Sequence, residues 1–416
     1  MNKPGFLSKN ENSITVLDYI CATLLALVPI LQHYKGPVYN AALTVAVGLV
    51  PYLLVRAFFI VRKMSIKQVF VQTSPVLIMV VYFLYRIIDH GTTVTEFGQC
   101  GVLIVYLLAA ALGCVKGRQM CRSAVVICMI ASVGLVVQYV GFYLFEHHVQ
   151  MVPTDWLLPT AEQWILGAQT GLAGITGRLN DFYRPSAFFL EPSHLYIYAF
   201  PQLFLVLFGS KTTIRRLVIA IIISLGMILS TSGMGMAVVA GAWLLYFALY
   251  DEKTGTFAIS NVLRRRNLVL MGSLVIVAFL AYLVVPSVQR TVNRIFATKS
   301  GTTAISGRIA RALQGLEGMN VWQWIFGKQD NTHGTAYNVP GLIGALIRHG
   351  LIGMVLSVEL YVVALFKDRL PYKLVAAIIL VTSVFSAHTH STVGMLYYML
   401  ILLSGYGALQ KEKVSD

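Results

Sequence analysis

Long apolar runs alternate with short polar connections along almost the whole chain. Twelve of these runs have roughly the 18 to 25 residues that a helix needs to cross about 30 Å of hydrocarbon. They lie near 14–32, 37–60, 72–88, 97–115, 123–145, 186–208, 214–230, 233–250, 268–286, 339–365, 372–388 and 392–409. Because the runs are continuously apolar and do not alternate in polarity, the pattern predicts helices and not the strands of a transmembrane barrel.

The composition extends this prediction to the whole molecule. The chain has 416 residues, of which 57% are hydrophobic and 12% charged, and its mean hydropathy is +0.73. These values lie outside the range of soluble domains. We therefore expect an all-α polytopic membrane protein with about 12 transmembrane helices and a single transmembrane domain over residues 1–416.

The net charge of +15 would suit a nucleic-acid partner, but the positions of the basic residues favour another explanation. Alternate connections hold 21 of the 32 Lys and Arg residues, among them Arg62, Lys63, Arg215 and Arg216. The opposite connections near 33–36, 89–96, 230–233 and 388–391 hold at most one each. The positive-inside rule then places both termini in the cytoplasm, with the first run retained as a helix. We expect lipid headgroups as partners and no nucleic acid.

Two connections are much longer than the others, 146–185 and 287–338, and both fall on the outer side of the membrane. They contain Trp156, Trp164, Trp322 and Trp324, which disordered linkers seldom carry. Long loops in a compact bundle are usually functional. We expect short amphipathic helices in both loops, lying at the membrane surface.

Arginines gather in the outer loops, against the topological trend. They are Arg178, Arg184, Arg290, Arg294, Arg308 and Arg311, joined by Arg348 near the start of the tenth run. A guanidinium matches the oxygens of a phosphate, so the cluster suits a lipid that carries phosphate or pyrophosphate. Headgroup anchoring, or salt bridges with Asp181, Glu317 and Asp330, is the alternative.

All nine histidines map to the outer half of the predicted topology. They are His33, His90, His147, His148, His194, His333, His349, His388 and His390. Histidine is a general base near neutral pH and could deprotonate a sugar hydroxyl. Zinc binding is less favoured, since the paired histidines lack the i, i+4 spacing of helical zinc ligands. For any single histidine an ordinary surface role stays open.

The segment Arg184-Pro185-Ser186-Ala187-Phe188-Phe189-Leu190-Glu191-Pro192-Ser193-His194 leads from the first long loop into the sixth run. It places Glu191 several residues into an apolar stretch, where an ionisable side chain is a functional candidate. We expect Pro192 to interrupt the helix there and free backbone groups for a ligand. Arg184 and His194 flank this position, and a purely structural Glu–Arg pair is the alternative.

Three further patterns stand out on the outer side. Ser306-Gly307-Arg308 lies in the second loop, where His333 and Asn338 follow, and Ser230-Thr231-Ser232-Gly233 forms a tight turn whose hydroxyls cap helix ends or line a cavity. Glycines 341, 344, 350 and 353 open the tenth run, where small residues let helices approach closely. For these glycines we favour packing over chemistry.

These segments resemble the O-antigen polymerase and O-antigen ligase family of bacterial polysaccharide assembly. The resemblance rests on the stretches at 184–193, 230–233, 306–308 and 350–353, within a layout that matches loosely from about 140 to 400. The Phe-Leu-Glu-Pro-Ser stretch favours the polymerase branch. The family implies metal-independent glycosyl transfer, with no cofactor, between undecaprenyl-pyrophosphate-linked glycans on the periplasmic side of the inner membrane.

The resemblance also implies roles for single residues. Glu191, His194 and His333 become catalytic candidates, and the pyrophosphate-binding set becomes Arg178, Arg184, Arg290, Arg308, Arg311, Arg348 and Asn338. A His-Asn pair often precedes the glycine-rich helix in the family, whereas five residues separate His333 from Asn338 here. The identity of the base therefore stays open.

Two alternative functions stay open beside polymerisation of repeat units. One is ligation of finished polymer to lipid A core, and the other, from a different class, is transport or flipping by a polytopic carrier. Carriers usually place charged groups near the bilayer midplane in related halves, whereas these candidates gather at one surface. A chain-length regulator and a flippase are the partners that polymerisation would involve.

Overall fold

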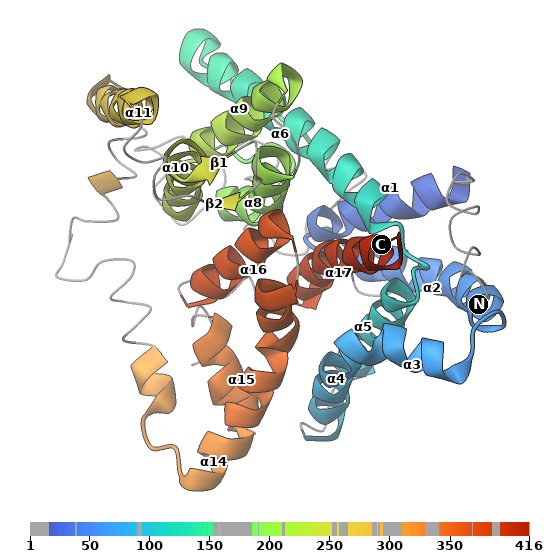
Figure 1. Cartoon of the computed structure of the whole chain (residues 1–416). Helices are drawn as coiled ribbons and strands as arrows, with labels where there is room; N and C mark the ends of the chain where they lie inside the picture. The colour runs from blue at the N-terminus through green and yellow to red at the C-terminus, as the bar shows by residue number, and fades with distance from the viewer. Residues whose placement is uncertain are drawn as a thin grey trace.

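The computed structural model describes residues 16–37, 40–89, 94–147, 149–152, 158, 185–189, 191–209, 213–251, 256–257, 265–284, 289, 292–293, 310, 312–328, 341–367, 369–384 and 392–415. These residues are helical apart from the connections and a sheet of two short antiparallel strands, β1 (Tyr250–Asp251) and β2 (Thr256–Phe257). The α-helices are α1 (Val16–Leu31), α2 (Ala41–Val61), α3 (Ile66–Thr73), α4 (Leu77–Asp89), α5 (Val94–Ala111), α6 (Gly117–Phe145), α8 (Pro192–Phe208), α9 (Ile214–Leu229), α10 (Gly233–Ala248), α11 (Arg265–Val284), α14 (Val321–Phe326), α15 (Gly341–Lys367), α16 (Leu370–Ser383) and α17 (Thr392–Ser415). Figure 1 shows their arrangement.

An apolar helix occupies each of the twelve runs, so the all-α prediction is confirmed for the described residues. Several boundaries differ: α6 begins at Gly117 and α17 ends at Ser415, each six residues beyond its run. The third run begins earlier, since α3, a short 3-10 turn (Ser74–Val76) and α4 continue one another over 66–89. The sixth begins later, at Pro192, because 185–189 form a non-helical turn.

Helix length divides the apolar helices into two groups. Four are long and apolar enough to cross a membrane: Ala41–Val61, Ile66–Ile88, Gly117–Phe145 and Gly341–Phe366. Shorter apolar helices lie at Val16–Leu31, Phe97–Ala111, Ser193–Phe208, Gly233–Ala248, Leu370–Ser383 and Gly394–Gly405. At 1.5 Å per residue these shorter helices span less than the full hydrocarbon thickness. The fold is that of a multi-pass membrane protein, and the number of complete spans stays a prediction.

Large apolar side chains cover the outside of several helices. Phe58 of α2 is 64% exposed and Val275 of α11 is 64% exposed, and their neighbours on the same helices are similar. Soluble proteins rarely expose contiguous apolar faces of this extent. Lipid is the solvent that suits these faces.

The helices α8 and α17 lie at the centre of the bundle. Tyr198 of α8 donates from its hydroxyl to the carbonyl of Ala26 in α1 (2.8 Å). Gln202 Nε2, also of α8, donates to the hydroxyl of Tyr397 in α17 (2.9 Å), which donates in turn to the carbonyl of Tyr198 (3.1 Å). These buried hydrogen bonds tie α1, α8 and α17 together, because a buried polar group without a partner is costly.

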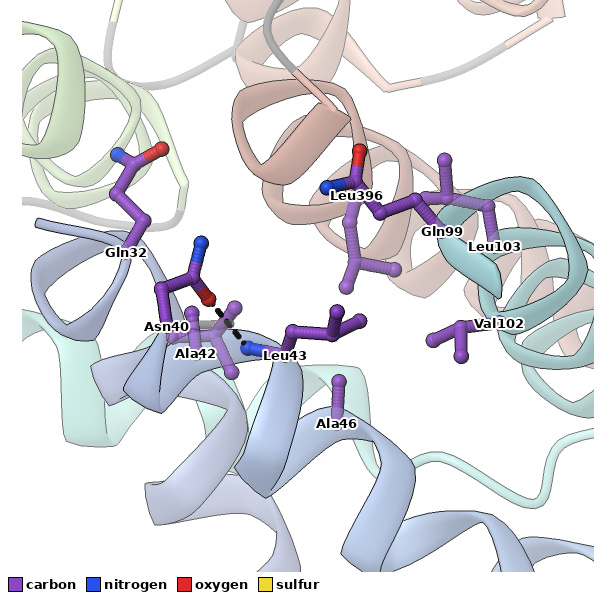
Figure 2. Close-up of a pocket in the computed structure, with 10 residues that line it drawn as sticks. Gln32, Asn40, Ala42, Leu43, Ala46, Gln99, Val102, Leu103 and Leu396 are labelled. Atoms are coloured by element: carbon purple, nitrogen blue, oxygen red, sulfur yellow. Dashed lines mark hydrogen bonds between the residues drawn. The ribbon is translucent and has the colours of Figure 1, made fainter. Parts of the chain in front are cut away.

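Connections that the charge pattern places on the outer side of the membrane meet at one end of the bundle. The hydroxyl of Tyr34, after α1, donates to the carbonyl of Phe188, before α8 (3.0 Å). The hydroxyl of Tyr85, on α4, donates to the carbonyl of Phe326 in α14 (3.0 Å). At this end α1, α2, α5 and α17 also line a half-open cavity of about 190 Å³ (Figure 2).

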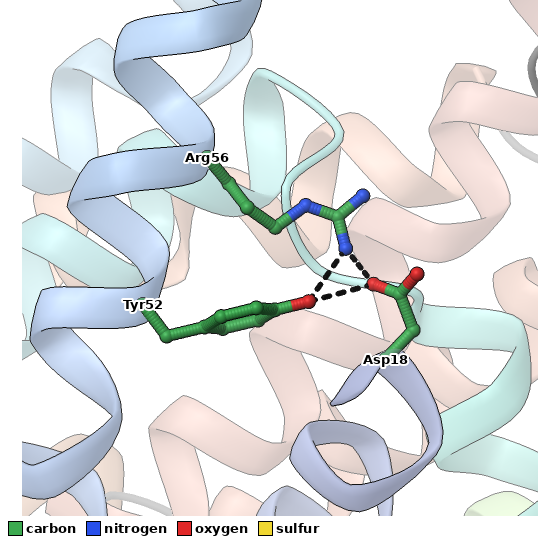
Figure 3. Close-up of polar contacts among 3 residues, drawn as sticks. All are labelled: Asp18, Tyr52 and Arg56. Carbon is green, nitrogen blue, oxygen red and sulfur yellow. Dashed lines mark hydrogen bonds and ion pairs between the residues drawn. The ribbon is translucent and has the colours of Figure 1, made fainter. Parts of the chain in front are cut away.

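Connections predicted to be cytoplasmic meet at the other end. Arg56 of α2 forms an ion pair with Asp18 of α1, and Tyr52 donates to the same carboxylate oxygen (2.9 Å) (Figure 3). Ser404, in the second half of α17, lies against Gly117 at the start of α6. Each of these contacts joins two residues that the charge pattern places on the same side.

Candidate functional site

Glu191 stands at the start of α8, at the end of the bundle that the charge pattern places outside. Its backbone is extended (φ −133°, ψ 139°), and it is the N-cap residue of the helix, with Pro192 in the first turn. Proline is favoured there because that position has no helical hydrogen bond to lose. The prediction that Pro192 interrupts a longer helix is therefore wrong, and Glu191 lies at the end of the apolar helix and not within it.

Two side chains of the first turn of α8 approach the Glu191 carboxylate. Ser193 Oγ donates to Glu191 Oε2 (2.8 Å), and His194 Nε2 lies 3.8 Å from the same oxygen. The His194 side chain is 6% exposed and that of Glu191 is 31% exposed. The Glu191 carboxylate is thus partly exposed, whereas the imidazole beside it is buried. A carboxylate, a hydroxyl and an imidazole this close together are groups that general acid–base catalysis uses.

His33, directly after α1, completes this group of side chains. Its ring stacks on the ring of His194 with the centroids 4.0 Å apart and the planes 7° from parallel. Two imidazolium charges at this separation would repel each other. We refer to Glu191, Ser193, His194 and His33 together as the Glu191 cluster.

The turn before α8 is fixed by one side chain from α6 and one from the connection after α1. Gln138 of α6, fully buried, accepts from the Ala187 backbone N–H (3.0 Å) and donates to the carbonyl of Val149 (3.1 Å). Ala187 has a left-handed backbone (φ 52°), which this pairing supports. From the other side, burial raises the pKa of the Tyr34 phenol, which therefore stays protonated and donates to Phe188. The turn is held rigid from both sides.

The Ser230-Thr231-Ser232 turn between α9 and α10 packs beside α8. All three residues are buried, and Ser232 Oγ caps α10 by accepting from the Gly235 N–H (3.3 Å). A Cβ placed on Gly235 would come within 2.9 Å of Tyr196 Cβ, which shows how closely the turn approaches α8. Of the two roles expected for these hydroxyls, helix capping is confirmed for Ser232.

Arg348 belongs to a second group of side chains, built by α4, α14 and α15. Arg348 is exposed on α15, and its Nε donates to the carbonyl of Gly344 (3.2 Å). The next residue, His349, is buried edge-on against the Tyr82 ring of α4, with centroids 5.8 Å apart. The structure therefore joins His194 with Glu191, but places Arg348 and His349 on a different helix pair.

Gly350 breaks α15 at this point. Its backbone is left-handed (φ 65°, ψ −173°), and a Cβ there would lie 2.1 Å from the carbonyl oxygen of Ile325 in α14. The predicted packing role of this glycine is confirmed, although its partner is the second long loop and its φ is the further reason for glycine.

The remaining predicted site residues lie outside the described residues. They are Arg178, Arg184, Arg290, Arg308, Arg311, His333 and Asn338. Their roles stay predictions, and so does that of Arg294. Among the described residues, no group of three or more His, Cys, Asp or Glu side chains is placed to hold a metal ion.

Two features of this end were missed in the sequence. The sequence does carry a signal for the hydrogen bonds of Gln138, because a lone amide in the apolar run 123–145 needs a polar partner. No sequence signal indicates the contact of His33 with His194, because the two residues are 161 positions apart. Only the tertiary structure brings them together, since α1 and α8 both pack against α6.

Comparison with known proteins adds no relative. No protein-family model, curated protein or solved structure matches the chain. A proposal for the function therefore depends on the residues of this chain.

Proposed function

We propose that the protein is a glycosyltransferase of the bacterial inner membrane that polymerises undecaprenyl-pyrophosphate-linked oligosaccharide repeat units on the periplasmic side. The observation that carries the proposal is the Glu191 cluster, in which a carboxylate, a hydroxyl and a buried imidazole meet where an apolar helix begins. Such a set can remove a proton from an acceptor hydroxyl beside a membrane. The resemblance of 184–193 to the polymerase branch supports the same reaction.

The proposed reaction forms one glycosidic bond and breaks one bond to phosphate. A hydroxyl of the incoming repeat unit attacks the anomeric carbon of the growing chain, and its proton passes to His194, with Glu191 orienting the imidazole. The bond between that carbon and the pyrophosphate oxygen breaks, and undecaprenyl pyrophosphate leaves with the electron pair. The proton then passes from His194 to water.

Arginines would stabilise the negative charge that develops on the leaving group, an electrostatic role that suits permanently charged side chains. The candidates are Arg178, Arg184, Arg290, Arg308, Arg311 and Arg348, with Asn338 as a neutral donor. Arg184 lies seven residues before Glu191 in the sequence, so it is our first candidate for this role. His333 is the alternative base, from the second loop.

The contacts at the two ends of the bundle support the orientation that this reaction needs. Tyr34, Phe188 and the Glu191 cluster meet at the end with few basic connections, whereas the Asp18–Arg56 pair lies at the basic end. The donor lipid and its glycan would reach the first end from the periplasmic leaflet. Both termini would lie in the cytoplasm.

The test uses membrane vesicles that contain the full-length protein and labelled lipid-linked repeat units. We expect Glu191→Gln and His194→Gln each to lower the rate of chain lengthening by about 10²- to 10⁴-fold, the usual contribution of a general base. The matched control is His147→Gln, since His147 is exposed at the end of α6. It should keep wild-type activity.

The outcomes separate the alternatives. Chain lengthening without a lipid A core acceptor supports a polymerase, and product that forms only with the core acceptor would show a ligase. Full activity of both Glu191→Gln and His194→Gln would remove the Glu191 cluster from the mechanism. Loss of solute movement with unchanged polymer synthesis would instead indicate a transporter.

A further inference from the structure

The cavity at the outer end of the bundle is lined by carboxamides and apolar side chains. Its volume is about 190 Å³, and its described lining consists of Gln32, Asn40, Gln99, Val28, Ala42, Leu43, Ala46, Val102, Leu103 and Leu396. Figure 2 shows the three amides around the same space, with apolar side chains below them. None of these lining residues carries a charge.

Each amide has a definite hydrogen-bonding character. Asn40 uses Oδ1 to cap α2, accepting from the Leu43 N–H (2.7 Å), so its amide hydrogens are directed to the cavity. Gln32 uses Nε2 to reach the Pro29 carbonyl (2.8 Å), which leaves its Oε1 as an acceptor. Gln99 adds a third carboxamide from α5. Asn40 thus offers the cavity a donor and Gln32 an acceptor.

This lining selects for a neutral ligand rich in hydroxyl groups. A hydroxyl both donates and accepts, as the amides do, whereas a phosphate would lose its hydration here without an opposite charge. The apolar wall of Val28, Val102 and Leu103 suits the C–H face of a sugar ring. The volume equals that of about six water molecules, and it is smaller than the roughly 300 Å³ at which pockets for drug-sized ligands begin. One sugar ring fits this description, and an oligosaccharide does not.

The cavity is connected to the Glu191 cluster through two helices. Gln32 directly precedes His33, whose ring stacks on His194. Leu396 directly precedes Tyr397, whose hydroxyl binds the carbonyl of Tyr198 in α8. A ligand in the cavity therefore lies beside the same segments of α1 and α17 that hold α8.

We propose that this cavity binds one neutral monosaccharide unit of the lipid-linked substrate and so positions the glycan relative to the Glu191 cluster. The assignment of the sugar to a lipid-linked glycan rests on the proposed function. The preference for a neutral sugar ring rests on the lining alone. The two parts are tested separately.

The first experiment measures sugar binding by the purified full-length protein in nanodiscs. Thermal unfolding is followed with increasing glucose, galactose or N-acetylglucosamine, and with galactose 1-phosphate as the charged probe. We expect at least one neutral sugar to raise Tm saturably, by about 1 to 3 °C at ten times its Kd. Galactose 1-phosphate should leave Tm unchanged.

Three variants test whether the sugar occupies this cavity. Gln32→Leu and Gln99→Leu each remove one amide, and we expect the half-saturating sugar concentration to rise about three- to tenfold. Asn40→Asp keeps the oxygen that caps α2 but replaces the amide donor with a charge, and it should abolish the response. Gln72→Leu, on α3 at the cytoplasmic side, is the matched control and should bind like the wild type.

A wild type with no response to any of the three neutral sugars would show that the cavity holds water only and would overturn the proposal. An equal response of Asn40→Asp and Gln72→Leu would also overturn it.

The second experiment measures chain lengthening, where Gln32→Leu should raise KM for lipid-linked repeat units with little change in kcat. An unchanged KM would show that the cavity does not bind the lipid-linked repeat units. Sugar binding without any chain lengthening by the wild type would contradict the proposed function and leave the cavity as a sugar site.

Discussion

At the scale of single residues, Gln138 has the clearest structural role near the Glu191 cluster. It lies in the apolar helix α6 with no exposed surface, yet both ends of its carboxamide are used. It joins the Ala187 N–H to the carbonyl of Val149, which fixes the turn that leads to Glu191. Polar side chains at such depth are retained where they satisfy backbone groups that helices leave free.

Gln138→Leu keeps the volume of the side chain but removes both hydrogen bonds. Each of the two backbone groups left without its partner costs about 1 to 3 kcal/mol, so we expect the free energy of unfolding to fall by about 2 to 6 kcal/mol. Thermal or denaturant unfolding of the purified protein measures the loss. Gln72→Leu, on α3, should change stability by less than about 0.5 kcal/mol. Equal stability of the two variants would contradict the role assigned to Gln138.

The histidines show what residue types alone can indicate. Their gathering on one half of the predicted topology pointed to the outer end, and His33 and His194 do meet there. Which pair would stack, and which carboxylate would join it, depended on the packing of α1 and α8 against α6. His147 lies exposed at the end of α6, and His349 packs against Tyr82.

At the scale of elements, α14 and the kink of α15 form one unit. Gly327, after α14, has φ 94°, and a Cβ there would lie 2.2 Å from the Arg348 carbonyl oxygen. The Lys328 N–H donates to the carbonyl of Ile347 (2.7 Å). The segment 321–328 of the second long loop thus packs on α15, while Trp322 of α14 stays 70% exposed. A tryptophan in this position suits the membrane interface.

Gly350→Ala would place a methyl group against Ile325 and impose a left-handed conformation on a residue that disfavours it. The conformation alone costs about 1 to 2 kcal/mol, and the clash adds to it. We expect α14 to separate from α15, which limited proteolysis of 318–328 would detect as faster cleavage. The matched control is Gly272→Ala on α11, where nothing lies within 4 Å of the added Cβ. Unchanged cleavage in Gly350→Ala would contradict this account of the kink.

Element boundaries were predictable where the chain carries local signals. Asn40, Ser65, Thr213 and Ser232 each precede a helix and cap it with a side-chain oxygen. The start of α8 was misplaced because an apolar run does not reveal where its first residues leave the helix. The left-handed backbone at Ala187 has no sequence signal, since alanine rarely adopts it.

At the scale of the whole molecule, the contacts divide the bundle into two ends that agree with the distribution of charge. The basic connections meet near Asp18, Arg56 and Gly117, and the others meet near Tyr34 and the Glu191 cluster. Basic residues remain on the cytoplasmic side because they are retained there during insertion. This agreement supports the proposed orientation.

Cysteine labelling tests that orientation directly. The five native cysteines are buried, so the parent protein should react little with a membrane-impermeant maleimide. His147→Cys, at an exposed position after α6, should label in intact spheroplasts. Lys63→Cys, exposed after α2, should label only after lysis. The reverse pattern would invert the topology and move the Glu191 cluster to the cytoplasm.

The sequence by itself determined the helices, their lipid-facing character and the side on which each connection is expected. These properties depend on the length of apolar runs and on the charges beside them, which are local features of the chain. Only the tertiary structure decided that His33 stacks on His194, that Gln138 clamps the turn before Glu191, and that Gln32, Asn40 and Gln99 share a cavity. Each depends on which helices become neighbours, and that choice is made by packing between segments far apart in the sequence.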